Sequence, residues 1–392
     1  MKAIILAAGE WTRLRPLTNT TPKPLIKIHW KTILEHNLKN IYKYVSEIII
    51  VVKYKAELIK ESIWDNYKWV KVKYHVQWEE KWTGAALKWL ESDIDVFVIN
   101  GDSIFEKEDL KKLLKFSWYW VLVKKVKNPS KYWIFELDLE KNVKKVIEKP
   151  KDFVWYLANL WVYRFDPKIL DIVNNIEKSS RGEYEITDAI NEFAESFPFK
   201  TFEIEWEFID IWFAPDILTA NSHFLNKLSK SKIKWEIEDW VTIKGKIVLE
   251  KWAIIKSWTY IEWNCYIWKD SSIWPNTYLR WSTTIWEWCK IWNAVEIKNS
   301  SIWDKTNVAH LSYIWDSIIW NNVNIGWGFI SANLRHDKAN IKIPVKWVFT
   351  DTGTHKFWII IWDNCKIWIN SSSMPWRIIE NDSLINPWTE IK

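Results

Sequence analysis

The chain has 392 residues, a formal net charge of +6 and 27% charged residues, a composition that excludes a disordered or membrane-embedded protein. Its length favours two domains, and the mild positive charge forms no stripe that would bind a nucleic acid. No apolar run of 18 residues occurs, so we expect no membrane partner. The cysteines Cys265, Cys289 and Cys365 form no CxxC motif, which favours a reducing, cytoplasmic location.

The first part of the chain, residues 1–228, alternates short β-branched runs with amphipathic stretches. The runs predict strands at Ile4–Leu6, Ile48–Val52, Val70–Val76 and Val96–Ile99. The stretches between them predict helices at Leu34–Tyr44, Ala56–Asn66, Ala85–Glu91 and Glu108–Lys115. This alternation is typical of an α/β, Rossmann-like domain, in which ligands bind at the carboxyl ends of the strands.

A Lys/Ser-rich linker at 229–239 separates this part from a region, 240–392, with a six-residue period. Ten aliphatic residues follow one another at six-residue spacing, from Ile243 to Ile297, and the repeat resumes at Ile302 and again at Ile361. This period fits neither an α-helix nor a hairpin sheet. It predicts a left-handed parallel β-helix of hexapeptide repeats, in which the aliphatic residues and the cysteines fill the interior.

The balance between glycine and tryptophan is abnormal: the chain has 8 Gly and 35 Trp, whereas an average protein of this length carries roughly 27 Gly. Within the repeat, Trp268, Trp286 and Trp315 directly follow the aliphatic residue, where Gly326 stands in another copy. A tight corner, often with positive φ, suits glycine and not an indole. We therefore predict that many of these tryptophans stand where the working protein has glycine, as a UGA codon decoded as glycine would produce.

The segment at 6–18 reads LAAGEWTRLRPLT and leads from a strand directly into a loop. With Trp11 taken as glycine, and with Pro22-Lys23-Pro24-Leu25 following, it resembles the triphosphate loop of the sugar-1-phosphate nucleotidylyltransferase family. The resemblance implies that Arg13 and Lys23 are catalytic and neutralise phosphate charge. It implies nucleotide-binding roles for Leu6, Ala7, Ala8, Gly9, Trp11, Thr12, Gln77, Trp82 and Thr83.

Further motifs follow in the order of the same family. Asn100-Gly101-Asp102 ends a buried strand, and Asp210 lies in Phe208-Ile209-Asp210. The resemblance implies that Asp102 and Asp210 hold Mg²⁺, which prefers carboxylate and phosphate oxygens. It also implies a sugar-phosphate pocket at Glu148, Lys149 and Asn159.

The segment from Ala309 to Asn333 is similar to the acetyltransferase site of the archaeal-type bifunctional enzymes that make UDP-N-acetylglucosamine. The resemblance implies that His310 is the catalytic base, with acetyl-CoA as co-substrate. Histidine suits that role because it titrates near neutral pH. Substrate-binding roles are implied for Arg280, Lys298, Tyr313, Asn324 and Asn333.

Three functions remain open from the sequence. The first is a bifunctional enzyme that acetylates glucosamine-1-phosphate and couples N-acetylglucosamine-1-phosphate to UTP or dTTP. The second is a monofunctional glucose- or mannose-1-phosphate nucleotidylyltransferase with a structural or regulatory β-helix. The third is a non-enzymatic, trimeric hexapeptide-repeat module. For the enzymes we expect a nucleoside triphosphate and a sugar-1-phosphate as partners, and a homotrimer as in the resembled family.

Overall fold

The computed structural model describes residues 1–15, 17–78, 84–179, 182–205, 208–332, 335–345, 348–351, 355–357 and 359–392. The predicted site residues Trp82, Thr83 and Asn333 lie outside these ranges. Contacts divide the chain into two compact units, one of residues 1–11, 21–27 and 31–210, the other of residues 12–20, 28–30 and 211–392. Among the helices of the described residues, none has the length and apolarity needed to cross a bilayer.

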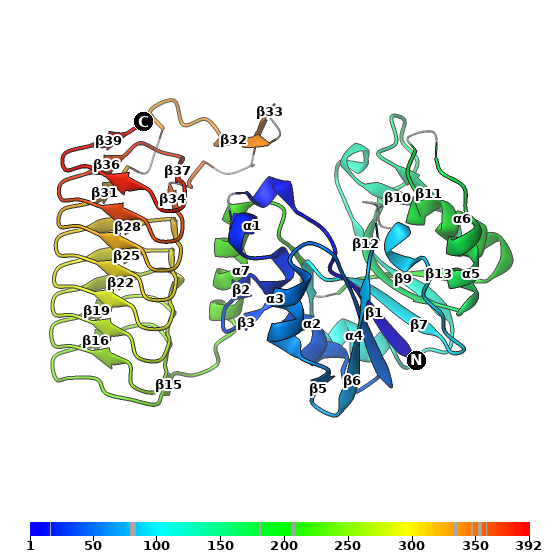
Figure 1. Ribbon diagram of the computed structural model, residues 1–392, viewed down its shortest axis with the longest axis horizontal. Coiled ribbons are helices and arrows are strands. Elements are labelled where there is room, and N and C mark those ends of the chain that lie inside the picture. The colour runs from blue at the N-terminus through cyan, green and yellow to red at the C-terminus, as the bar shows by residue number, and fades with distance from the viewer. Residues whose placement is uncertain are drawn as a thin grey trace. The chain divides into compact units, whose positions relative to one another are not determined.

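The first unit is built on a mixed sheet whose strand order is β11-β10-β12-β7-β1-β4-β6-β5 (Figure 1). The predicted parallel centre is confirmed, because β1 pairs in parallel with β4 and β7, and β4 with β6. Strand β12 adds an antiparallel half beside β7 and β9. The strands are β1 (Lys2–Leu6), β4 (Glu47–Val52), β5 (Asn66–Tyr67), β6 (Val70–Val76), β7 (Val96–Asn100), β9 (Tyr119–Lys125), β10 (Trp133–Leu137), β11 (Val143–Glu148), β12 (Leu157–Phe165) and β13 (Phe199–Glu203).

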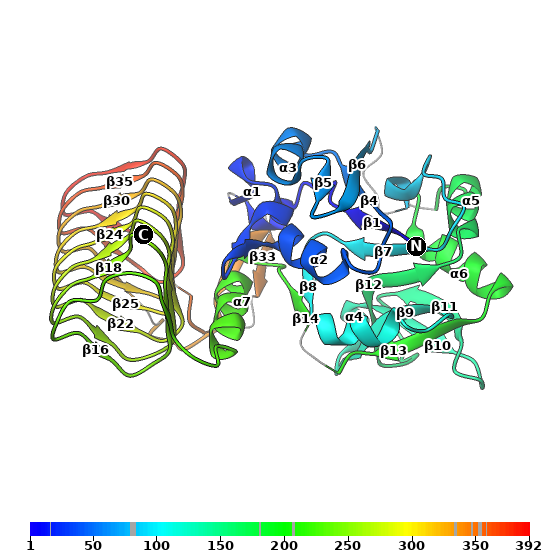
Figure 2. The same ribbon diagram turned by 90° about the horizontal axis from the view of Figure 1, so that it is seen from below.

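Helices cover both faces of this sheet, because alternate residues of β1 point into two different cores. Ala3 and Ile5 pack with α2, α3 and α4, whereas Ile4 and Leu6 pack with α5 and α6. Figure 2 shows the same two layers from below. The helices of this unit are α2 (Ile33–Ile41), α3 (Ala56–Ile63), α4 (Lys107–Leu113), α5 (Lys168–Asn175) and α6 (Ile186–Ser196), whereas α1 (Leu17–Thr20) and α7 (Ala214–Asn226) belong to the second unit. The remaining short strands of this part of the chain are β2 (Lys27–Ile28), β3 (Lys31–Thr32), β8 (Ser103–Phe105) and β14 (Phe208–Asp210).

The predicted helix at Ala85–Glu91 is wrong. The structure has a single 3₁₀ turn there, Ala85–Leu87, because Lys88 is extended and Trp89 has a left-handed φ of 65°. The apolar run that suggested a helix instead buries Ala85, Ala86 and Leu87 as a connecting turn. The positive φ of Trp89 suits glycine, which is a frequent helix terminator.

The second unit contains a three-sided parallel β-helix, as predicted. Successive turns stack in register, so that Ile261 pairs with Leu279 and Leu279 with Ile297, and these three side chains are fully buried. The three cysteines are free thiols in this interior. A hairpin of β32 (Lys342–Val345) and β33 (Val348–Asp351) interrupts the repeat, and Ile319 then pairs with Ile361.

The three sheets of the β-helix contain strands of two or three residues. The first has β15 (Lys232–Ile233), β17 (Ile247–Leu249), β20 (Cys265–Ile267), β23 (Thr283–Ile285), β26 (Ser301–Ile302), β29 (Ile318–Ile319), β34 (Ile359–Ile361) and β37 (Arg377–Ile379). The second has β16 (Thr242–Ile243), β19 (Tyr260–Ile261), β22 (Tyr278–Arg280), β25 (Glu296–Lys298), β28 (Tyr313–Trp315), β31 (Ile330–Ser331), β36 (Ser372–Ser373) and β39 (Glu390–Ile391). The third has β18 (Ile254–Ile255), β21 (Ser272–Ile273), β24 (Lys290–Ile291), β27 (Asn307–Val308), β30 (Asn324–Ile325), β35 (Lys366–Ile367) and β38 (Leu384–Ile385).

Left-handed backbone recurs three residues after the interior aliphatic residue of a repeat. At this position Gly328 has a φ of 74°, Asn322 one of 56° and Asp270 one of 60°. Glycine, asparagine and aspartate are the residues that adopt this conformation most readily. Tryptophan occupies the same position elsewhere, at Trp252, Trp258, Trp288 and Trp388. The backbone therefore favours the interpretation that these tryptophans stand at glycine positions.

The position directly after the aliphatic residue needs a different explanation. None of the tryptophans there, such as Trp268, Trp286 and Trp315, is among the described residues with positive φ. Gly326 at this position is required by crowding: an added Cβ would lie 2.8 Å from the carbonyl oxygen of Ile367. The expectation that this corner position has a positive φ was wrong. Glycine is favoured there because successive turns approach each other closely, as they do at Gly326.

Replacing a left-handed tryptophan by glycine should stabilise the protein more than replacing it by alanine. Trp288 is about half exposed with a φ of 61°, where an L-residue costs roughly 1–2 kcal/mol and glycine does not. Glycine also raises the conformational entropy of the unfolded chain, which offsets part of this gain. We therefore expect the free energy of unfolding of W288G to exceed that of W288A by about 1 kcal/mol. Urea denaturation measures the difference. At exposed Trp69, which has no positive φ, alanine should be the better replacement; the same order at both sites would contradict the interpretation.

Candidate active sites

The first candidate site begins where β7 ends, at the carboxyl edge of the parallel strands. Gly101 follows β7, and its N–H donates to the carbonyl oxygen of Leu6 at 2.9 Å. An added Cβ at Gly101 would lie 2.9 Å from that same oxygen, so only glycine permits this approach. The close packing of the two strand ends places Asp102 beside the loop that leaves β1. The predicted carboxylate thus lies at the edge where parallel sheets bind ligands.

Two carboxylates and one ammonium group meet at this edge. Lys23 Nζ lies 2.7 Å from Asp102 Oδ2 and 3.6 Å from Asp210 Oδ1, and the lysine side chain is 1% exposed. Lys23 belongs to a 3₁₀ turn, Lys23–Leu25, whereas Asp210 ends β14, which pairs with β8 directly after Asp102. Two carboxylates that meet at one cationic group are a donor set that suits Mg²⁺.

The predicted phosphate loop runs from Ala7 to Trp11, and the indole of Trp11 lies within it. Trp11 has a φ of 49°, and the Lys23 ammonium is 4.0 Å from the centroid of its ring. An added Cβ on Gly9 would be 2.5 Å from the indole nitrogen. A literal tryptophan therefore occupies the space beside Lys23 that a triphosphate would need, and its left-handed backbone suits glycine.

The other predicted nucleotide-binding residues lie on separate elements. Leu6 ends β1, Ala7, Ala8 and Gly9 continue its loop, and Thr12 and Arg13 lie in a 3₁₀ turn, Thr12–Leu14. The exposed guanidinium of Arg13 lies over the Trp212 ring at 5.0 Å. Gln77 is buried after β6, and its N–H donates to the carbonyl of Val52.

The predicted sugar-phosphate residues lie on β11 and β12. Glu148 ends β11 and lies 3.5 Å from the ammonium of Lys149, which has a φ of 41°. Asn159 is buried in β12 and donates to the Tyr163 hydroxyl at 2.6 Å. Trp161, with a φ of 61°, lies at the irregularity where the register of β12 against β9 shifts. A glycine is the usual left-handed residue of such a bulge.

The second candidate site lies on the outer face of the sheet that contains β22, β25 and β28. Arg280 and Lys298 are in register on neighbouring strands, and Arg280 Nε lies 2.8 Å from Glu296 Oε1. The Lys298 ammonium lies 3.5 Å from the ring centroid of Trp281 and 3.3 Å from that of Trp315. Burial lowers the pKa of Lys298 to about 8. The nearby Asp316 carboxylate acts in the opposite direction, because it stabilises the charged ammonium.

The predicted catalytic His310 is exposed at the corner between β27 and β28, where its ring lies 5.4 Å from that of Trp292. Tyr313 lies on β28, on the same sheet as Arg280 and Lys298, and hydrogen-bonds to Arg280. Asn324 lies on β30 of the adjacent sheet and pairs with Asn307. The predicted acetyltransferase residues are therefore divided between two corners of the β-helix, because His310 precedes β28 whereas Arg280 and Lys298 end β22 and β25.

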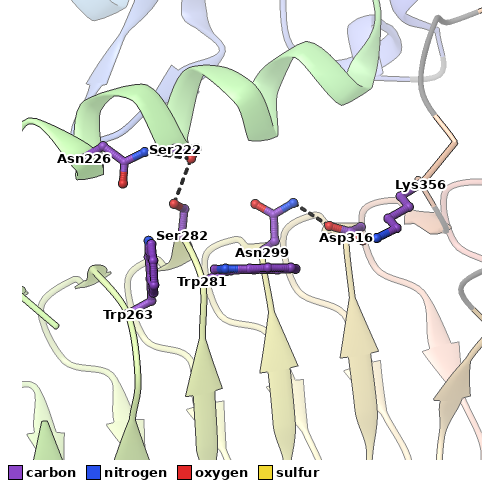
Figure 3. A pocket seen from close by; sticks show the side chains of 8 residues that line it. All are labelled: Ser222, Asn226, Trp263, Trp281, Ser282, Asn299, Asp316 and Lys356. Carbon is purple, nitrogen blue, oxygen red and sulfur yellow. Dashed lines mark hydrogen bonds between the residues drawn. The ribbon is translucent and has the colours of Figure 1, made fainter. Parts of the chain in front are cut away.

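A cavity of about 420 Å³ opens at the opposite end of β22, β25 and β28, where α7 runs along the β-helix (Figure 3). Ser222 and Ser282 hydrogen-bond across it at 2.9 Å. It is lined by Ser222, Asn226, Trp263, Trp281, Ser282, Asn299, Asp316 and Lys356. The cavity lies directly beside Lys298, which precedes Asn299 in the chain.

Asp316 is the charged residue of this region that the sequence did not single out. Its carboxylate is 4% exposed and accepts a hydrogen bond from Asn299 Nδ2 at 2.5 Å, and its backbone N–H donates to the carbonyl of Lys298. Its second oxygen has no hydrogen-bond partner among the described residues. Burial raises the pKa of Asp316 to about 6. The sequence offered one signal for Asp316, namely its position immediately after the His310–Trp315 segment. That signal was insufficient, because an isolated aspartate at a turn usually lies at the surface.

A family model and two curated relatives agree on the family to which this chain is similar. The model of the Nucleotidyl transferase family matches residues 2–226. A protein named bifunctional protein GlmU from Methanocaldococcus jannaschii is 39% identical over 378 residues, which cover 96% of this chain and 91% of that protein. A bifunctional sugar-1-phosphate nucleotidylyltransferase/acetyltransferase from Sulfurisphaera tokodaii is 36% identical over 377 residues, covering 96% and 93%.

A solved structure supports the fold of the nucleotidyltransferase part. A putative glucose-1-phosphate thymidylyltransferase from Bacillus anthracis matches with a TM-score of 0.52 and 23% identity, covering 59% of this chain and 98% of that one. The full-length relatives extend the likeness through the β-helix. The chain therefore belongs to the family of bifunctional sugar-1-phosphate nucleotidylyltransferases/acetyltransferases.

Proposed function

We propose that this chain acetylates glucosamine-1-phosphate with acetyl-CoA and then transfers a uridylyl group from UTP to the N-acetylglucosamine-1-phosphate product. The observation that carries the nucleotidyl transfer furthest is the convergence of Lys23, Asp102 and Asp210 at the carboxyl edge of the sheet. Full-length likeness to relatives named as bifunctional favours this function over a monofunctional enzyme or a non-enzymatic assembly module. Ala7, Ala8 and Gln77 favour uridine or thymidine over guanosine.

In nucleotidyl transfer, a phosphate oxygen of the sugar attacks the α-phosphorus of the triphosphate and pyrophosphate leaves. Such reactions depend mainly on positioning and on neutralisation of charge. Asp102 and Asp210 would hold Mg²⁺, which supplies positive charge to the phosphate oxygens when bound. Lys23 and Arg13 would neutralise the remaining charge, and Glu148, Lys149 and Asn159 would orient the sugar phosphate.

In acetyl transfer, the amine of the sugar attacks the thioester carbonyl, the C–N bond forms, and the thiol of the coenzyme leaves. His310 would accept the proton that the amine loses. Arg280 and Lys298 would bind the sugar phosphate, while Tyr313, Asn324 and Asn333 would orient the substrate. Because His310 lies before β28 whereas Arg280 and Lys298 end β22 and β25 at the other corner of that face, we propose that a second copy in a homotrimer completes the site.

A direct assay tests the acetyltransferase half. Purified protein is incubated with acetyl-CoA and glucosamine-1-phosphate, and free thiol and N-acetylglucosamine-1-phosphate are measured. We expect both in equal amounts. Release of pyrophosphate from UTP without any acetyl transfer would instead support the monofunctional enzyme.

The pKa of Lys298 gives this acetyl transfer a defined pH dependence. Its ammonium is charged below about pH 8 and loses its charge above that value. We expect the KM for glucosamine-1-phosphate to rise by up to about tenfold per pH unit above pH 8, because the charged fraction falls by that factor. In K298R the KM should stay flat to pH 9.5, since arginine remains protonated. A flat KM in the unsubstituted enzyme would contradict the role of Lys298.

A further inference from the structure

Lys23 lies at the position that the metal of the proposed nucleotidyl transfer would take. Its ammonium is within 2.7 Å of Asp102 and 3.6 Å of Asp210, so one cationic group already bridges the two proposed metal ligands. Mg²⁺ binds carboxylate oxygens at about 2.0–2.1 Å and excludes an ammonium from the same point. A metal ion held by Asp102 Oδ2 and Asp210 Oδ1 would therefore compete with Lys23 in its observed position.

The ammonium of Lys23 is buried, and it lies at the end of a side chain with several rotatable bonds. Lys23 and Asp102 are 1% and 4% exposed, so their pairing is shielded from water. The backbone of Lys23 is held in a short 3₁₀ turn between Pro22 and Pro24. Its four-carbon stem is flexible, which lets the charge shift while the main chain stays in place. The loop of Ala7–Trp11, which resembles a triphosphate loop, lies beside it, with the Trp11 ring 4.0 Å from Nζ.

We propose that Lys23 is a positioning residue of the metal site, whose ammonium substitutes for the metal and keeps Asp102 and Asp210 together until metal and triphosphate enter. This inference rests on the proposed nucleotidyl transfer and adds a function for Lys23 before substrate binds. Without the lysine, two carboxylates converge with no counter-charge and repel each other. With it, the ligands of the metal are already arranged.

The same arrangement makes binding of metal depend on the nucleotide. A metal ion that enters alone must expel a buried ammonium and leave it without an anion, which is unfavourable. When a triphosphate is present, its oxygens accept the displaced ammonium, and Lys23 stabilises the phosphates instead of the carboxylates. Metal and triphosphate therefore raise each other's affinity through this side chain, beyond their direct attraction.

The test measures binding of Mn²⁺ to the full-length protein in the absence of nucleotide, by electron paramagnetic resonance of free Mn²⁺. In K23M, which keeps an unbranched side chain without the charge, we expect affinity for Mn²⁺ to rise at least about tenfold over the unsubstituted protein, within the usual range of coupling between ligands. K27M removes a nearby lysine charge and should leave the affinity unchanged. Equal or weaker Mn²⁺ binding by K23M would overturn the proposal, because a purely structural lysine would not oppose metal.

Thermal unfolding provides a second measurement, and a second variant protects the test against misfolding. Without metal, K23M should unfold at a lower temperature than the unsubstituted protein, and Mn²⁺ should raise its midpoint by more. K23Q retains a hydrogen-bond donor to Asp102 and should show the same direction in both measurements. If Mn²⁺ raises the unfolding midpoint equally in the unsubstituted protein, K23M and K23Q, the proposed role of Lys23 is overturned while the metal assignment stands. Failure of every protein to bind Mn²⁺ even with UTP would instead overturn the metal assignment, and this proposal with it.

Discussion

Asp102→Asn should lower the rate of nucleotidyl transfer by at least about 10³-fold, because the substitution removes a charged metal ligand at the reacting phosphate. Asparagine keeps the shape of the side chain and one oxygen. It does not keep the charge that both Lys23 and a divalent cation require. The rate is measured as release of pyrophosphate from UTP and N-acetylglucosamine-1-phosphate at saturating Mg²⁺.

The same substitution should also lower thermal stability, since the buried Lys23 loses its 2.7 Å carboxylate partner. Removing one member of a buried pair typically costs about 3–5 kcal/mol, and Asp210 at 3.6 Å reduces that loss. Acetyl transfer by the same preparation serves as the control for folding, and Asp171→Asn on the exposed face of α5 as the control for a lost charge. Turnover retained in D102N would contradict the metal assignment.

His310→Ala should remove acetyl transfer and leave nucleotidyl transfer intact. A general base contributes about 10²–10⁴-fold, so kcat for acetyl transfer should fall by that factor with a smaller change in KM. The His310 side chain is exposed at a corner of the β-helix, so its truncation leaves no cavity in a core. Thiol release from acetyl-CoA measures the first activity and pyrophosphate release the second.

The matched control for this variant is His223→Ala on α7, outside both proposed sites. It should keep both activities. Loss of both in H310A would indicate collapse of the fold, and unchanged acetyl transfer would show that another group accepts the proton.

The fold was largely predictable because it rests on periodic patterns. Interior aliphatic residues such as Ile261, Leu279 and Ile297 recur at six-residue spacing, and no other regular structure buries that pattern. Similarly, β1 and β7 are continuous apolar runs that only a sheet covered on both faces can bury. The helix at Ala85–Glu91 failed because apolarity over seven residues does not separate a helix from a buried turn.

The sites were predictable only in part. Lys23, Asp102 and Asp210 are far apart in the chain, and their convergence followed from resemblance and not from spacing. Asp316 was missed because its burial depends on stacking of the turns and on α7, which no local pattern encodes. The excess of tryptophan correctly indicated left-handed backbone within the repeat. The predicted position, directly after the aliphatic residue, was wrong, because positive φ occurs three residues after it. Three predicted residues, Trp82, Thr83 and Asn333, lie outside the part of the chain that the structure describes.

The tryptophan interpretation also bears on which protein should be assayed. Within the part of the chain that the structure describes, eleven tryptophans have positive φ, namely Trp11, Trp64, Trp89, Trp161, Trp240, Trp252, Trp258, Trp281, Trp288, Trp376 and Trp388. The first of these fills the loop beside Lys23. Activity measurements should therefore use the chain with glycine at Trp11 alongside the chain as written.

The central claim, that one chain carries two separate and consecutive activities, is tested most directly by mixing the two inactive variants. Glucosamine-1-phosphate, acetyl-CoA and UTP are supplied together, and UDP-N-acetylglucosamine is measured. We predict that D102N alone stops at N-acetylglucosamine-1-phosphate, that H310A alone leaves glucosamine-1-phosphate unacetylated, and that the mixture forms the nucleotide sugar. A mixture that forms none, while H310A still uses added N-acetylglucosamine-1-phosphate, would contradict the claim.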